Sequence, residues 1–202
     1  SSLGREGTMD TSDRVQGKAE ARPQRGRGLT RRFGRSDGGS VVVEFALLII
    51  PFTMLVFAIL ESCISFAAQQ VLANATDDVA RQFRTGQIKP ADLVDDPDLV
   101  KKKICRRMEV LVATDCPGLS IDLKSYDTFA EAAAKRTILK DRDIDTTGFG
   151  IEPGLSGSKN QLRVFYRWPV MTDFMRKSMS NLKDGKTLLF ASVTWQNEPF
   201  DD

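Results

Sequence analysis

An almost uninterrupted run of apolar residues is the strongest pattern in the chain. It extends over residues 40–60, and Glu44 is the only charged residue within it. About 20 predominantly apolar residues are what an α-helix needs to cross roughly 30 Å of hydrocarbon. The pattern therefore predicts a transmembrane helix over residues 40–60, and Pro51 inside it predicts a kink.

The pattern becomes periodic after this run. Apolar residues recur every three or four positions with polar residues between them, which is typical of an amphipathic helix. The helix is predicted to continue through residues 61–85 and to end near Arg84, where Thr85–Gly86 follows. Residues 40–84 would then form one helix about 67 Å long, with Glu61 marking the water side of the bilayer. The predicted buried stripe consists of Ile64, Ala68, Val71, Leu72, Ala75, Val79 and Phe83.

Residues 86–202 carry shorter patterns of both helix and strand. Alternating apolar and polar residues predict strands, and a capping Asp before Pro predicts a helix start. The fold class is therefore α+β: a long N-terminal helix followed by a small domain with helices against one face of an antiparallel sheet. The predicted elements are a helix from 96–98 onward, a strand over 119–126, a helix over 128–135, a strand over 161–168, a helix over 172–182 and a strand over 187–196.

Residues 1–39 differ from the rest of the chain in composition. They are rich in Gly, Arg and Ser and contain nine basic and five acidic residues, with few large apolar ones. Such a composition predicts a disordered leader. Arginines gathered next to an apolar helix favour a cytoplasmic N-terminus. Residues 62–202 hold 20 basic and 20 acidic residues, so nothing in their charge predicts nucleic-acid binding. Residues 86–202 are accordingly expected in the periplasm, outside the inner membrane.

Glu44 needs a physical explanation, because an acidic side chain at mid-bilayer costs about 2.5–3.5 kcal/mol on insertion scales. Protonation, contact with headgroups or pairing with a cation would lower this cost. One interpretation is a tolerated interfacial Glu on an ordinary signal anchor. The alternative is that cleavage between Gly39 and Ser40 creates an α-amine with a pKa of about 8. That amine and the carboxylate of a neighbouring helix would then neutralise each other.

The run GSVVVEFALLIIP, from Gly39 to Pro51, resembles the class III signal of type IV pilin-like proteins. More narrowly, it resembles the TadE-like minor pseudopilins of the tight-adherence (Flp or Tad) pilus. The run ASVTWQNEPF, from Ala191 to Phe200, is similar to the end of the same family. The roughly 130 residues between these two ends show only a diffuse resemblance.

The resemblance implies a processing and assembly role. A prepilin peptidase would cleave between Gly39 and Ser40 and remove the leader, and Glu44 and Phe45 would set subunit register. The implied partners are other pilin and pseudopilin subunits, the Tad inner-membrane assembly platform and the lipid bilayer. The implied function is assembly or initiation of an adherence pilus, with no catalytic residues.

Three cysteines and one acidic loop are further candidate sites. Cys105 and Cys116 are predicted to form a disulfide in an oxidising periplasm, the alternative being two reduced thiols, while Cys63 stays free. Asp141, Asp143, Asp145 and Glu152 stand at positions 1, 3, 5 and 12 of a calcium-loop pattern. Thr146 occupies the position that requires Gly for the turn. The alternative is a solvated acidic loop, and no other cofactor is predicted.

Two other functions compete with the pseudopilin hypothesis. One is a signal-anchored periplasmic binding or enzymatic domain, although the chain has no His and no phosphate-cradling loop. The other is an exported protein cleaved after Ser65-Phe66-Ala67, or lipidated at Cys63 within a poor lipobox. The N-terminal residue of the membrane-extracted protein separates the three hypotheses.

Overall fold

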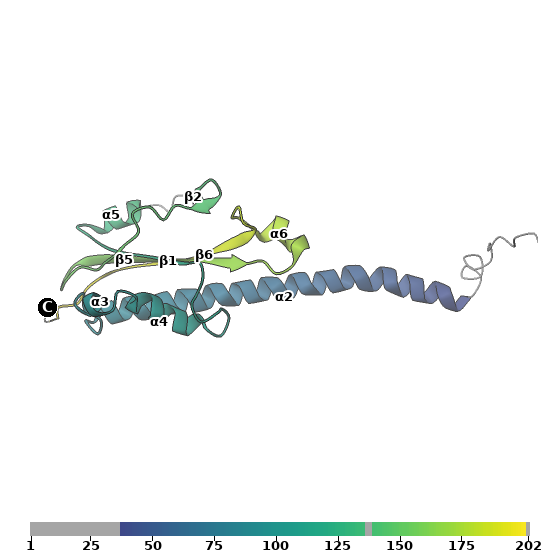
Figure 1. Ribbon diagram of the computed structural model, residues 1–202, viewed down its shortest axis with the longest axis horizontal. Coiled ribbons are helices and arrows are strands. Elements are labelled where there is room, and N and C mark those ends of the chain that lie inside the picture. The colour runs from purple at the N-terminus through teal and green to yellow at the C-terminus, as the bar shows by residue number, and fades with distance from the viewer. Residues whose placement is uncertain (1–36, 136–138, 201–202) are drawn as a thin grey trace, which may run out of the picture. The chain divides into compact units, whose positions relative to one another are not determined.

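The computed structural model describes residues 37–135 and 139–200 (Figure 1). The predicted disordered leader therefore lies almost entirely outside the described residues. The helices are α2 (Asp37–Arg84), α3 (Asp92–Asp95), α4 (Leu99–Met108), α5 (Phe129–Ala134) and α6 (Asp173–Met179). The strands are β1 (Leu119–Tyr126), β2 (Leu139–Lys140), β3 (Asp143–Ile144), β4 (Ile151–Glu152), β5 (Lys159–Pro169) and β6 (Lys186–Gln196).

Helix α2 is the longest element, at 48 residues. It begins three residues before the predicted start, continues through Pro51, and ends at Arg84 as the periodic pattern predicted. The chain divides into two compact units, residues 1–48 and residues 49–202. In the first unit, residues 37–48 are helical and the side chains of residues 41–48 are exposed. The paragraphs that follow concern the second unit.

The main sheet has four strands in the order β4-β1-β5-β6. Strands β1, β5 and β6 pair antiparallel along most of their lengths, as the alternation predicted. Strand β4 pairs parallel with β1, with Leu123 opposite Ile151, so the sheet is mixed rather than antiparallel throughout. Strand β4 is only two residues long, too short to show alternation in the sequence.

One face of the sheet forms the apolar core of this unit with α2 and α4. The register aligns apolar residues across the three long strands, for example Leu123 with Leu162 and then Val193. Leu72 of α2 and Ile104 of α4 are fully buried in the same cluster. The other buried residues of α2 in this cluster are Ala68, Ala75, Val79, Ala80 and Phe83.

The buried stripe of α2 is rotated relative to the prediction at its start. Ile64 was expected to be buried but is 39% exposed, whereas Glu61 and Ser65 are buried. Val71 is only partly buried, while Thr76, which lies outside the predicted stripe, is fully buried. The Thr76 hydroxyl donates to the Leu72 carbonyl of its own helix at 2.7 Å. This internal hydrogen bond satisfies the hydroxyl and allows it to lie in the core.

The second face of the sheet is covered as well, which the prediction of helices on one face did not include. Figure 1 shows α5 and β2 on the side of the sheet opposite α2 and α4. Helix α5 starts at a capping Thr128, whose side chain accepts the Glu131 N–H at 3.1 Å. Under this cover, Asp122 and Arg163 form a buried ion pair on neighbouring strands. This face thus combines a buried charge pair with aromatic contacts such as Phe165 against Phe149.

The C-terminal run packs on the end of α2. Gly86 adopts φ +70°, which reverses the chain after the helix, and a Cβ there would lie 2.7 Å from the Phe200 ring. The Glu198 N–H donates to the Arg84 carbonyl at 2.9 Å, satisfying one of the last carbonyls of α2. Trp195 lies with its ring centroid 6.4 Å from that of Phe83. These contacts join the end of the chain to the end of its long helix.

Candidate functional site: the apolar segment of helix α2 and its anchorage

The apolar segment of α2 is exposed along its whole length. Between Val41 and Leu60, only Ala58 is partly covered. In the part of the chain that the structure describes, α2 is the one helix long and apolar enough to cross a membrane. Exposed apolar surface costs about 25 cal/mol per Å² in water, so a segment of this size requires lipid or other apolar helices around it.

The residues predicted to act in processing and assembly lie at the start of this segment. Gly39 and Ser40 fall within the first turns of α2, as their backbone assignment shows. Glu44 and Phe45 follow about one turn later, and both side chains are exposed. Because they are adjacent in a helix, they point about 100° apart around the axis. The structure thus places these positions close together along the helix, while cleavage and subunit register stay predictions.

Glu61 anchors the other end of the segment to the folded domain. Its side chain is buried, with the residue only 7% exposed, although it directly follows the apolar run. Its carboxylate accepts hydrogen bonds from the Met171 N–H, the Thr172 N–H and the Thr172 hydroxyl. These three donors come from the turn that leads into α6. Glu61 therefore has a structural role in the domain, while its predicted place at the water side of the bilayer stays a prediction.

Two neighbouring features strengthen the attachment of α2. The Gln69 side-chain amide donates to the Phe190 carbonyl at 2.8 Å, and its oxygen accepts the Phe190 N–H at 3.3 Å. Strand β6 lies at the edge of the sheet, and Gln69 satisfies the backbone N–H and carbonyl of Phe190 on its outer side. Arg107 of α4 donates to the Asp78 carboxylate of α2 at 2.9 Å. Neither Gln69 nor Asp78 belongs to the stripe that was predicted to be buried, so these contacts were not predicted from the sequence.

The predicted disulfide is present. Cys105 of α4 and Cys116 of the turn before β1 are bonded, with a Cα–Cα distance of 5.8 Å. Both residues are buried in the cluster that contacts α2. Cys63 is free and exposed. The bond thus fixes α4, which covers α2, to the first strand of the sheet.

Replacing both Cys105 and Cys116 with serine is expected to lower the free energy of unfolding by about 3 kcal/mol. The disulfide joins residues 11 positions apart, and without it the unfolded chain gains conformational entropy. Urea unfolding followed by the fluorescence of Trp168 and Trp195 measures the loss. Cys63→Ser is the matched control and should leave the midpoint unchanged. An unchanged midpoint for the double variant would contradict the predicted contribution.

The candidate calcium residues are not gathered around a common point. Asp143 accepts the Ile144 N–H at 2.8 Å and pairs with Arg167 at 3.1 Å, and Lys183 lies 3.6 Å away. These interactions, the Ile144 N–H first among them, hold the pKa of Asp143 below its ordinary value. Asp145 accepts the N–H of Thr147. Within residues 37–135 and 139–200, no group of three acidic, His or Cys side chains could hold a metal ion. Asp141 and Glu152 are exposed.

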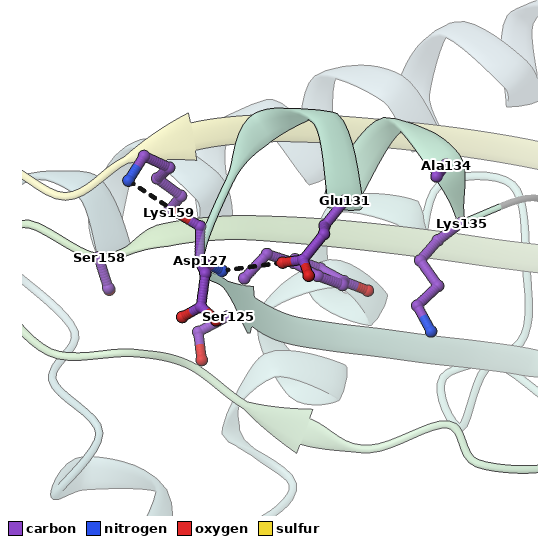
Figure 2. Close-up of a pocket in the computed structure, with 8 residues that line it drawn as sticks. Ser125, Asp127, Glu131, Ala134, Lys135, Ser158 and Lys159 are labelled. Atoms are coloured by element: carbon purple, nitrogen blue, oxygen red, sulfur yellow. Dashed lines mark hydrogen bonds between the residues drawn. The ribbon is translucent and has the colours of Figure 1, made fainter.

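An open, polar depression lies between α5 and the adjoining ends of β1 and β5 (Figure 2). Glu131 points back toward the start of its helix and accepts the Asp127 N–H at 3.3 Å. Lys159 donates to the Asp127 carbonyl at 3.0 Å. Burial raises the pKa of Tyr126, which also lines the depression. These hydrogen bonds hold α5 on the sheet, so the residues that line the depression have a structural role.

Comparison with known proteins supports the resemblance predicted from the sequence. A family model described as TadE-like protein matches residues 39–81, which include the apolar segment and most of the buried stripe of α2. No curated protein matches the chain. No solved structure matches it either. The family match indicates a role related to the Tad pilus and association with other pilus components. Members of this family are typically not enzymes. The C-terminal run from Ala191 to Phe200 lies outside the matched residues.

Proposed function

We propose that this chain, whose residues 39–81 match the TadE-like family, is a minor pseudopilin that assembles or initiates a Tad pilus. In this proposal a prepilin peptidase removes residues 1–39, and the new N-terminus at Ser40 begins the mature helix. Residues 40–60 lie in the inner membrane, and the domain of residues 86–202 lies in the periplasm. The observation that carries the proposal is the exposed apolar segment of α2, with a single carboxylate near its start.

The exposure of the segment favours packing against other subunits over packing within its own domain. From Val41 to Leu60 the apolar side chains are exposed, apart from the partly covered Ala58. Leu60 is followed at once by the buried part of α2, where the Glu61 carboxylate accepts the Met171 N–H. The apolar segment and the part of α2 that packs on the domain belong to one continuous helix. This is the arrangement that a subunit needs when helices pack in a bundle and the domains pack around it.

Glu44 supplies the recognition step in this proposal. Association of apolar helices within lipid gains little from hydrophobicity, because lipid is equally apolar. A carboxylate and an α-amine on neighbouring helices can fix one register, since each lowers the cost of holding the other in an apolar environment. Phe45 lies beside Glu44 and would pack against the neighbouring helix. The leader must be removed first, because the amine does not exist before cleavage.

The N-terminal residue of the native protein tests the proposal most directly. The protein is extracted from membranes, and its intact mass and N-terminal sequence are determined. An N-terminus at Ser40 supports the proposal. An uncleaved start would favour a signal-anchored domain, and a start at Ala68 or a lipid on Cys63 would favour an exported protein. Any of these three results would overturn the proposed processing.

Gly39→Ala is expected to slow processing, because the added methyl group lies next to the bond that is cleaved. The expected result is accumulation of the unprocessed chain, measured as the ratio of long to short forms after a pulse of synthesis. Gly34→Ala, five residues upstream in the leader, is the matched control and should not change the ratio. Processing of Gly39→Ala at the unaltered rate would place the cleavage elsewhere.

A further inference from the structure

Helix α6 has little support from the rest of the domain. None of its seven residues is buried. Met171 in the preceding turn is 67% exposed and Phe174 in its first turn is 47% exposed. Hydrogen bonds attach the helix to the rest of the domain near its two ends. Glu61 accepts the Met171 N–H just before its start, and the Thr187 hydroxyl donates to the Met179 carbonyl at its end, at 2.7 Å. Isolated helices this short are not stable in water, so a further apolar surface would explain why α6 forms.

The hydrogen bonds of Glu61 fix the position of α6 along α2. They hold Met171 and Thr172 beside the residue that directly follows the apolar segment. Figure 1 shows α6 and α3 at opposite ends of the sheet. If residues 40–60 cross the bilayer, as proposed above, then Met171 lies within about one helical turn of the hydrocarbon boundary.

The outer surface of α2 remains uncharged beyond Glu61. The Glu61 carboxylate is turned into the domain, so it does not interrupt the exposed apolar surface. Ile64 and Phe66 are exposed, Phe66 to 72%, and the next charged residue in the chain is Asp77. The surface that can contact lipid therefore continues past the level of Glu61 and reaches the level of α6.

We infer that the turn at Met171 and helix α6 form a foot that rests in the headgroup layer of the bilayer that α2 crosses. This inference rests on the proposed membrane span. Met171 and Phe174 insert their apolar side chains among the upper acyl chains. Residues 171–186 contain four basic and two acidic residues, which suits a layer of anionic phospholipids. Asp173 pairs with Arg176 and Asp184 pairs with Lys186, both at 2.9 Å, so the acidic charges are balanced within this stretch and its net charge is +2.

Site-specific fluorescence in vesicles tests the inference. The full chain, with Cys63→Ser to remove the free thiol, is reconstituted into vesicles of phosphatidylethanolamine and phosphatidylglycerol. An environment-sensitive fluorophore is attached in separate variants at Phe174→Cys, at Leu55→Cys as a reference inside the apolar segment, and at Val94→Cys as a control on α3. Lipids that carry a quencher near the headgroup or deep in the acyl chain are then added.

The expected result is a blue-shifted emission at position 174 that is quenched most strongly by the shallow quencher. Position 55 should be quenched by the deep quencher, and position 94 by neither. If position 55 is quenched but position 174 behaves like position 94, the membrane span stands and the inference is overturned. If position 55 is not quenched, both the span and the inference fail. A blue shift at position 174 without lipid quenching would mean that the label is buried against protein, in its own chain or in another copy, and would also overturn the inference.

Glu61→Ala tests the anchoring step. The variant removes the acceptor of the Met171 and Thr172 N–H groups, so the label at position 174 should lose most of its quenching while position 55 retains it. Ser65→Ala, one turn further on the same buried face, is the matched control. Glu61→Gln keeps one acceptor oxygen and should restore part of the quenching. Unchanged quenching in Glu61→Ala would show that Glu61 does not position the foot.

Discussion

Replacing Arg163 with methionine is expected to lower the free energy of unfolding by about 3–5 kcal/mol. The guanidinium donates to Asp122 Oδ2 through Nε at 3.1 Å and also through Nη2, and the Asp122 side chain is almost fully buried. The other Asp122 oxygen accepts the Gly150 N–H at 3.1 Å. Methionine fills much of the volume but leaves the carboxylate buried without its cation, which is the costly way to break such a pair.

Urea unfolding of the detergent-solubilised chain, followed by tryptophan fluorescence, measures this loss. Arg107→Met is the matched control, because Arg107 makes a similar 2.9 Å pair with Asp78 but its side chain is 65% exposed. Exposed pairs contribute about 1 kcal/mol or less. The double variant Asp122→Leu with Arg163→Met should recover most of the lost stability, since no charge is then left buried. Equal effects of Arg163→Met and Arg107→Met would contradict the burial argument.

The long elements were predictable because their patterns are long. The end of α2 at Arg84 follows from an apolar period that stops where Gly86 supplies a positive φ. Strand β1 was predicted with its observed bounds, because eight residues are enough for alternation to be distinct. The approximate positions of β5 and β6 followed from their apolar and aromatic residues. Local pattern thus determined most of the secondary structure.

The elements that were missed are short or depend on distant contacts. Strands β2, β3 and β4 have two residues each, so they carry no period to detect. On the second sheet face, Phe149 stacks against Phe165, a contact that no local pattern indicates. The same holds for the Asp122–Arg163 pair, whose partners are 41 residues apart. Sequence reasoning saw these residues only as alternating polar positions or loop.

The sequence drew attention to Glu44, near the start of the apolar segment of α2, but not to the buried contacts of Glu61, directly after its end. Glu44 attracts attention in the sequence because it interrupts an apolar run, and the family match covers it. Glu61 looks like an ordinary boundary residue, yet its carboxylate is held by donors 110 and 111 residues away. The two carboxylates therefore have different physical roles. Glu61 is satisfied within its own chain, whereas the proposed role of Glu44 depends on a neighbouring subunit.

Glu44→Val is expected to be cleaved after Gly39 like the unaltered protein but to be nearly absent from assembled pili. Hydrogen bonds to charged groups contribute about 1.5–3 kcal/mol, which corresponds to roughly 10- to 150-fold weaker association when one partner is removed. The fraction of processed protein that co-purifies with sheared pili and with the assembly platform measures the effect. Leu47→Val, a similar apolar change one turn along the helix, is the matched control.

This prediction separates assembly from folding, because Glu44 is exposed and lies outside the compact unit of residues 49–202. The urea midpoint of Glu44→Val should therefore equal that of the unaltered protein, and so should its cleavage. Glu44→Asp keeps the charge on a shorter side chain and should retain part of the incorporation. If Glu44→Val entered pili at the unaltered level, the counter-charge between neighbouring helices would not be what sets their register, and apolar packing around Phe45 would have to do so alone.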